Sequence, residues 1–461
     1  MRFLPSVAVV EAATPASRDR ALDLVRLVSL LVVISGHGVM LLVTITPERI
    51  SFRNLLSGST TLQAATWFLQ ILPLFFFAGA ASSALGWRPG MAWGAWLLRR
   101  AQRLFRPIFY YLAAWAVLLT IVREFAAPAA AERIASISTQ LLWFIGIYVM
   151  VLAAVPALAA IRTGRALASV VIGLYASAAV VDVIRLGSST ASGITWLGYV
   201  NLTVWLIPAA LGVGYVRGLI TRWTALVTAA VLFLFDVLLV LAGPYELSLV
   251  TVDGQTLSNM TPPSLLLAGH AIVLSLLFVA LAPACASLAR RPAVWRYIVV
   301  GNRGAMTLYL WHMPALLAVV YVSHLLGFDR SDPEQPGFAV LVVVQLAALY
   351  VLTAVFLVVL GGLESRPLPW WDDPIARLGH RRDVLVGAAV FVAGALTLVS
   401  TKWGLTGSGV DCILAALAAL ALARLLAHRT IPDRTLAPEL ERLAVPHTVG
   451  CGRILSDTAD S

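Results

Sequence analysis

Residues 22–45 read LDLVRLVSLLVVISGHGVMLLVTI, an apolar run that contains two ionisable side chains, Arg26 and His37. The run is long enough to cross the hydrocarbon core of a bilayer, which takes about 20 helical residues. An ionisable side chain inside such a helix is costly, so by default it marks a functional site. The separation of Arg26 and His37 is close to three full helical turns. Both side chains therefore project from one helix face, about 16 Å apart along the axis.

The rest of the chain has the composition of a membrane protein. It has 461 residues, of which 60% are hydrophobic and 12% charged, and its mean hydropathy is +0.89. A soluble globular domain carries about twice that fraction of charge. We therefore expect an all-α polytopic transmembrane bundle, with ten helices in its core and two more at its C-terminal end. The expected spans are 22–45, 63–85, 107–122, 139–161, 166–184, 196–216, 224–243, 263–284, 305–327, 337–362, 384–400 and 408–427.

The basic side chains are distributed unequally between the two sides of these spans. If the N-terminus is cytoplasmic, 25 of the 33 Lys and Arg residues lie in inner segments and seven in outer segments. This is the asymmetry expected of the positive-inside rule. It predicts a multi-pass protein of the plasma membrane with both termini in the cytoplasm. The net charge of +10 is then a topology signal and does not indicate a nucleic-acid partner.

The same pattern divides the chain into four parts. We expect a cytoplasmic N-terminal segment at 1–20, a ten-span core at 21–366, two additional transmembrane helices at 384–427 and a mobile cytoplasmic tail at 428–461. The tail mixes charge, Pro and Gly without apolar periodicity. The three cysteines are widely spaced, which predicts neither a disulfide framework nor a metal site.

His37 lies in the sequence Ser35-Gly36-His37-Gly38, where the glycines allow a ligand or another helix to approach the ring closely. A neutral imidazole can act as a general base, which suits the deprotonation of a hydroxyl group. The alternative is a buried histidine in a packing face of small residues. Asp23 stands three residues before Arg26, and we expect the two to form an ion pair that lowers the cost of burying the cation.

A cluster of arginines precedes the third span in WLLRRAQRLFRPIFYY, residues 96–111. Arg100, Arg103 and Arg106 follow one another at helical spacing, and the last two fall nearly one turn apart. Two guanidinium groups facing one target at the cytoplasmic boundary would suit phosphate or carboxylate. The alternative is a cluster that anchors the topology and binds lipid headgroups.

A further polar group opens the ninth span in GNRGAMTLYLWHMP, residues 301–314. His312 lies there, with Tyr309 one turn before it. This pattern is equally compatible with a functional site and with a hydrogen-bonded histidine that only packs between helices. After the tenth span, Glu364 is placed to pair with an arginine of the cytoplasmic face.

Together these segments resemble the membrane-bound acyltransferase family 3, and more closely its actinobacterial members. The resemblance covers residues 18–366 and follows the family's order. It rests on the Arg-x10-His motif of Arg26 and His37, on LPLFFFAGAASSALGW at 72–87, on the Arg-x-x-Arg of Arg103 and Arg106, and on GNRGAMTLYLWHMP.

The resemblance implies an integral membrane O-acyltransferase without a bound cofactor. Its donor would be acyl-CoA and its acceptor a hydroxyl group of a glycan, lipid or secondary metabolite. By the resemblance, His37 is the catalytic base, Arg26 belongs to the same motif, and Arg103 and Arg106, with Arg100, hold the donor. Tyr309, His312, Asp23 and Glu364 are candidates for supporting roles. Membrane lipids are expected partners and nucleic acid is not.

Two other interpretations remain open at the level of the sequence. Twelve spans with intramembrane Asp182, Asp236 and His270 are also compatible with a proton-coupled transporter or flippase. The two halves of the chain show no evident sequence symmetry, which argues against this interpretation. The other alternative is an accessory subunit without activity of its own.

Overall fold

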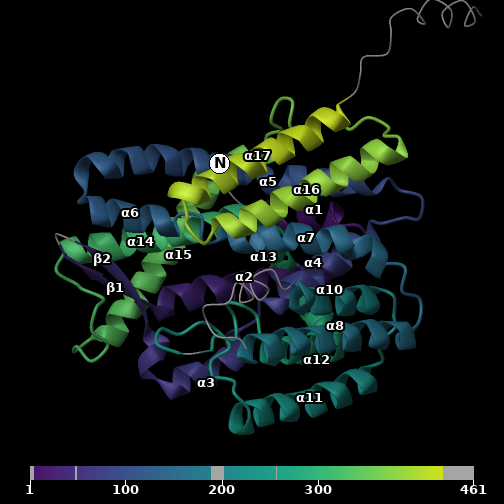
Figure 1. Ribbon diagram of the computed structural model, residues 1–461, viewed down its shortest axis with the longest axis horizontal. Helices are drawn as coiled ribbons and strands as arrows, with labels where there is room; N and C mark the ends of the chain where they lie inside the picture. The colour runs from purple at the N-terminus through teal and green to yellow at the C-terminus, as the bar shows by residue number, and fades with distance from the viewer. Residues whose placement is uncertain (1–4, 47–48, 188–201, 256, 429–461) are drawn as a thin grey trace, which may run out of the picture.

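The computed structural model describes residues 5–46, 49–187, 202–255 and 257–428, and it confirms an all-α bundle with one small hairpin (Figure 1). In chain order the elements are α1 (Val7–Ala12), α2 (Arg20–Met40), β1 (Leu41–Ile45), β2 (Ile50–Asn54), the 3-10 helix η1 (Leu55–Gly58), α3 (Thr60–Leu69), α4 (Pro73–Leu85), α5 (Trp93–Phe125), α6 (Pro128–Ile137), α7 (Leu142–Leu158), α8 (Gly164–Gly187), α10 (Thr203–Val216), α11 (Arg222–Ala242), α12 (Leu265–Ala289), α13 (Pro292–Arg303), α14 (Ala305–Leu325), α15 (Phe338–Ser365), α16 (His380–Ser400) and α17 (Gly407–Ala427).

Within these described ranges, eleven helical segments are long and apolar enough to cross a membrane. The chain is therefore a multi-pass membrane protein. The remaining predicted span, 196–216, corresponds to the shorter apolar helix α10, and its first six residues lie outside the described ranges. Most of the tail predicted at 428–461 also lies outside them.

Helix α2 begins as the sequence predicts but ends earlier. The side chain of Asp19 caps its N-terminus by accepting hydrogen bonds from the backbone N–H groups of Ala21 and Leu22. The predicted span 22–45 is wrong at its end, because α2 stops at Met40 and the next five residues form β1. These residues are aliphatic or β-branched, and they pair antiparallel with β2 in a hairpin, a pairing that is not evident from hydropathy.

Helices α13 and α14 follow each other with a break at Gly304, and α13 runs beside the first half of α2. The side-chain amide of Asn302 donates a 2.8 Å hydrogen bond to the carbonyl of Asp23, and Gly301 packs against Leu27. Helix α14 consequently starts part of the way along α2. This offset brings the first turns of α14 level with the C-terminal half of α2.

The two helices predicted near the C-terminus are present and pack against α5 and α7. Glycines make this contact close: a Cβ atom on Gly146 of α7 would lie 2.6 Å from the carbonyl oxygen of Gly394 on α16. Asp383 of α16 also accepts a 2.9 Å hydrogen bond from the N–H of Ala95 in the first turn of α5. Helices α16 and α17 are therefore packed into the bundle over an extensive surface.

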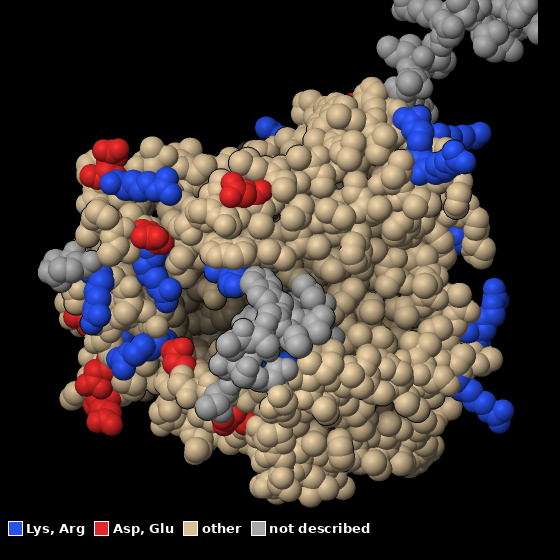
Figure 2. Space-filling view, viewed as in Figure 1, with Lys and Arg blue, Asp and Glu red and all other residues tan. Residues whose placement is uncertain are grey.

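The two ends of the bundle differ in charge. In Figure 2 the right-hand rim shows Lys and Arg without visible Asp or Glu, the left-hand rim shows both signs, and the surface between them is uncharged over most of its area. We use the name arginine-rich end for the side of the bundle where α2 starts at Arg20, α11 starts at Arg222 and α12 ends just before Arg290, because these three arginines line one cavity. The uncharged band between the rims is the surface expected to contact lipid.

Candidate functional site

The site is built around His37, which lies in the last turn of α2 and is partly exposed. Figure 2 shows a hollow in the face of the molecule where Figure 1, in the same view, draws α2. Arg26 lies on the same helix, as predicted, and is also partly exposed. About 16 Å of helix axis separates the two residues, so they cannot contact the same reacting atom.

The histidine of the ninth predicted span meets His37 directly. Nδ1 of His37 lies 2.8 Å from Nε2 of His312, and the two ring planes are inclined by only 7°. Because the N–H bonds and lone pairs of imidazole lie in the ring plane, this arrangement allows a linear hydrogen bond. His312 is fully buried, and its other nitrogen, Nδ1, lies 2.6 Å from the carbonyl oxygen of Tyr309.

These contacts determine the direction of the hydrogen bonds. A carbonyl oxygen can only accept, so Nδ1 of His312 donates to Tyr309. With both rings neutral, Nε2 of His312 then carries a lone pair and accepts from Nδ1–H of His37. This leaves the lone pair of His37 on Nε2, which makes no hydrogen bond within the described part of the chain. The geometry therefore presents His37 Nε2 as a proton acceptor.

Helix α15 closes the other side of this turn. The hydroxyl groups of Ser35 and Tyr350 lie 2.6 Å apart, and Tyr350 also donates to the carbonyl of Leu31. Gly38 packs so closely against Leu346 and Leu349 that a Cβ atom would collide with Leu346. Glycine beside His37 thus allows α2 and α15 to approach closely, and a Cβ atom there would displace the end of the Leu346 side chain.

Tyr309 and Asp23 have structural partners of their own. The hydroxyl of Tyr309 donates to the carbonyl of Leu141, which fixes the start of α14 against α7.

The expected pair of Asp23 with Arg26 is wrong, because both carboxylate oxygens of Asp23 accept from Arg18, at 2.5 and 2.8 Å. Arg18 precedes the helix and its side chain can fold back over Asp23, whereas Arg26 points to the same face as His37.

The three arginines of α5 are not brought to one target. Arg106 makes a bidentate ion pair with Asp372, at 2.8 and 2.6 Å. Arg100 lies over the ring of Trp96, 3.8 Å from its centroid, and donates to Ser83. Arg103 is exposed. Glu364 lies in α15, but its side chain is outside the described residues.

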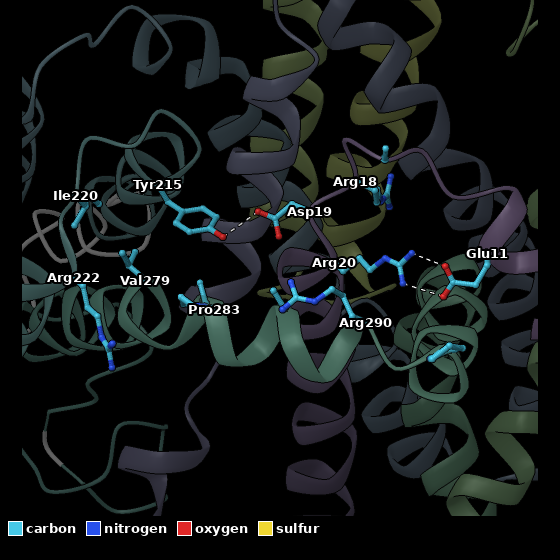
Figure 3. Close-up of a pocket in the computed structure, with 14 residues that line it drawn as sticks. Glu11, Arg18, Asp19, Arg20, Tyr215, Ile220, Arg222, Val279, Pro283 and Arg290 are labelled. Carbon is cyan, nitrogen blue, oxygen red and sulfur yellow. Dashed lines mark hydrogen bonds and ion pairs between the residues drawn. The ribbon is translucent and has the colours of Figure 1, made fainter.

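A cavity of about 810 Å³ opens at the arginine-rich end (Figure 3). Its floor is a strip of small apolar residues on α12 that includes Pro283. Arg20 is bound to Glu11 across one wall, and the hydroxyl of Tyr215 donates to Asp19 on the other. The Glu11 carboxylate has a lowered pKa, chiefly because Arg20 donates hydrogen bonds to it. Arg222 and Arg290 also line the cavity, and both are exposed.

The sequence did not single out these cavity residues, nor Asp372, Tyr350 or Arg330. Arg330 is a buried cation next to the last turn of α2. Nothing in the sequence distinguishes this buried arginine, in a loop between two predicted spans, from an exposed one. Among the described residues, no group of three or more His, Cys, Asp or Glu side chains is placed to hold a metal ion.

A protein-family model matches a large part of the chain. The model of acyltransferase family 3, described as an acyltransferase domain, matches residues 19–363, which cover the chain from the cap of α2 into α15. No curated protein and no solved structure matches the chain. The matched region contains His37, His312 and the three arginines of α5, and it ends before α16.

Proposed function

Since the chain belongs to acyltransferase family 3 and is a membrane acyltransferase, we propose that it transfers an acyl group from acyl-CoA to a hydroxyl group of a glycan, lipid or secondary metabolite, with His37 as the general base. The observation that carries this proposal is the hydrogen-bonded pair of His37 and His312. The pair leaves one imidazole lone pair free in a partly exposed position.

This geometry supports the following reaction. The acceptor hydroxyl gives its proton to Nε2 of His37 while its oxygen attacks the thioester carbonyl. The imidazolium formed is held through Nδ1–H by Nε2 of His312, which accepts the same hydrogen bond before and after proton transfer. The tetrahedral intermediate then expels the CoA thiolate, which takes the proton back from His37. The products are an ester and CoA, and the histidines return to their starting state.

The donor requires cations on the side from which it enters. We propose that the arginine-rich end faces the cytoplasm, with both termini on that side of the plasma membrane. Arg103 is an exposed arginine of the α5 cluster, and Arg222 and Arg290 are two exposed cations that line the cavity. Arg26 lies between this end and His37 on one face of α2. Phosphates held at this end would leave the thioester free to extend along that face toward His37, about 26 Å from the start of the helix.

Family membership favours this enzyme over the proton-coupled transporter or flippase. Of the carboxylates that suggested a transporter, Asp182 is held by Arg185 and Tyr245. Asp236 is fully buried on α11, and neither of its oxygens has a hydrogen-bond partner within the described ranges.

The proposal is tested with membranes that contain the protein and acyl-CoA labelled in its acyl group. We expect transfer of label to a membrane-associated acceptor, in a linkage that mild base cleaves because it is an ester. Matched membranes without the protein supply the control. Release of free acyl acid without any labelled acceptor, or uptake of a solute into vesicles without acyl-CoA, would contradict the proposal.

The donor site is tested separately. Arg103→Ala should raise the apparent KM for acyl-CoA about tenfold, while the KM for the acceptor changes little, because a guanidinium–phosphate contact acts on one substrate alone. Equal increases in both KM values would argue against a donor site at Arg103.

A further inference from the structure

Arg330 lies in the segment that joins α14 to α15, and only 1% of it is exposed. No carboxylate within the described residues forms an ion pair with it. A buried cation without a counter-ion is expensive, and burial lowers the pKa of Arg330 to about 10. The side chain still carries its charge at neutral pH, so compensating contacts must hold it.

Those contacts come from two helices and the hairpin. One terminal nitrogen, Nη2, donates to the carbonyl oxygens of Gly38 and Val39, at 2.6 and 2.7 Å. The other, Nη1, donates to the side-chain oxygen of Gln345 on α15, at 2.9 Å. The backbone carbonyl of Arg330 accepts from the N–H of Val43 in β1. The guanidinium group thus lies at the C-terminal end of α2, where the helix dipole favours a cation.

Gly38 and Val39 are the two residues that follow His37. We propose that Arg330 is a positioning residue for the catalytic base: it clamps the last turn of α2 to α15 and to the segment after α14, and thereby holds His37 in register with His312. This inference rests on the proposed function for its catalytic consequence. The clamp itself is a claim about structure that can be measured without any acyl transfer.

The chemistry requires arginine in particular. Three oxygen acceptors on two helices surround one side chain, and the planar fork of guanidinium can reach all three at once. Lysine would keep the charge and one or two of the contacts. Glutamine would lose the charge, and its single amide group could replace only part of the hydrogen bonding.

The kinetic test compares Arg330→Gln and Arg330→Lys with the wild-type protein. We expect Arg330→Gln to lower kcat at least about tenfold with little change in either KM, because a displaced base affects the chemical step more than binding. Arg330→Lys should restore part of that loss. The matched control is Arg53→Gln, since Arg53 donates to the carbonyl of the neighbouring Ser331 from an exposed position. It should behave as wild type.

A second readout follows the histidines themselves. Diethyl pyrocarbonate modifies an imidazole nitrogen that has a free lone pair, and mass spectrometry locates the adduct. In the full-length wild-type protein and in Arg53→Gln, His37 should be labelled and His312 protected, because both nitrogens of His312 are hydrogen-bonded. In Arg330→Gln the turn is released, and His312 should become labelled as well. The buried His270 reports general unfolding and should stay unlabelled.

The outcomes separate the two proposals. The wild-type labelling pattern in Arg330→Gln, or an unchanged kcat, overturns the positioning role. If Arg330→Gln unfolds and His270 is labelled, Arg330→Lys decides: protected His312 with partly restored kcat supports the clamp, and a folded Arg330→Lys without any restored kcat overturns it. If the wild-type protein transfers no acyl group, the proposed function fails, while the labelling pattern still tests the clamp.

Discussion

At the scale of single residues, the central feature is that His312 determines which nitrogen of His37 is free. The sequence placed both histidines inside predicted spans and identified His37 as a candidate base. It could not show that they touch, because they lie on helices far apart in the chain and the contact depends on where α14 starts beside α2. An offset of one turn would have separated the two rings.

The role of His312 can be tested by substitution. His312→Ala removes the acceptor for Nδ1–H of His37, and we expect kcat to fall about 10²-fold, at the lower end of general-base effects. His312→Gln can still accept at its amide oxygen, so it should retain more activity than His312→Ala. Steady-state kinetics on the purified proteins would measure both. Equal losses in the two variants would argue against the hydrogen bond as the cause.

The ion pairs of the site show why local spacing was a poor guide. Asp23 and Arg26 have a favourable helical spacing, yet Asp23 binds Arg18. Arg106 was expected to face a ligand, yet it binds Asp372, which comes from the segment after α15. Sequence spacing reports neighbours on one helix, whereas a buried guanidinium takes the best-placed carboxylate in three dimensions.

At the scale of elements, hydropathy located nearly all the membrane helices, because a run of apolar residues cannot be stable in water unless it is buried. It did not locate their ends. The strand β1 continues the apolar run of α2, and α13 carries too much charge to read as part of a span. Both features depend on pairing with other segments, which the composition of a single run does not reveal.

The pair of Arg106 and Asp372 fastens the segment after α15 onto α5, and its strength can be measured. Both side chains are largely buried, at 14% and 8% exposure. Removing one partner leaves a buried charge, so Arg106→Ala and Asp372→Ala should each lower the free energy of unfolding by about 3 kcal/mol. The double variant should lose less than the sum of the two. Unfolding in mixed micelles gives the values, and additive losses would contradict a direct pair.

The contact between α7 and α16 predicts a second stability effect. Gly146→Leu places a side chain against the backbone of Gly394 and should lower the free energy of unfolding by about 1–3 kcal/mol or more. Gly173→Leu is the matched control, since a Cβ atom there meets nothing within 4 Å. Equal thermal stability of the two variants in detergent would show that α16 is not packed on α7 as described.

At the scale of the whole molecule, the two differently charged ends predict an orientation in the membrane. Arg222→Cys places a thiol at the arginine-rich end and Asp332→Cys places one at the opposite end, both at exposed positions in a background without the native cysteines. A membrane-impermeant thiol reagent should label Asp332→Cys in intact cells and Arg222→Cys only after permeabilisation. The reverse pattern would place the arginine-rich end outside.

The same arrangement places the proposed donor side and the proposed base at the two ends of α2. Cations cluster where α2 begins, and the free imidazole nitrogen lies where α2 ends, so one helix joins the side proposed for the donor to the proposed base. Most of the helices, and the presence of His37 and Arg26 on one of them, could be predicted from the sequence. The partner of the base and the arginine that clamps its turn could not, because both are defined by contacts between distant segments.

The most direct test of this account is single-turnover acyl transfer by purified protein in lipid vesicles, comparing wild type with His37→Gln and His270→Gln. Both substitutions remove an intramembrane histidine, but the hydrogen bond of His270 is to the backbone of Gln70 and its ring packs on Trp67, so it has no contact with the His37 pair among these interactions. We expect transfer to fall at least about 10²-fold in His37→Gln and to persist in His270→Gln. Wild-type transfer by folded His37→Gln would contradict the assignment of His37 as the base.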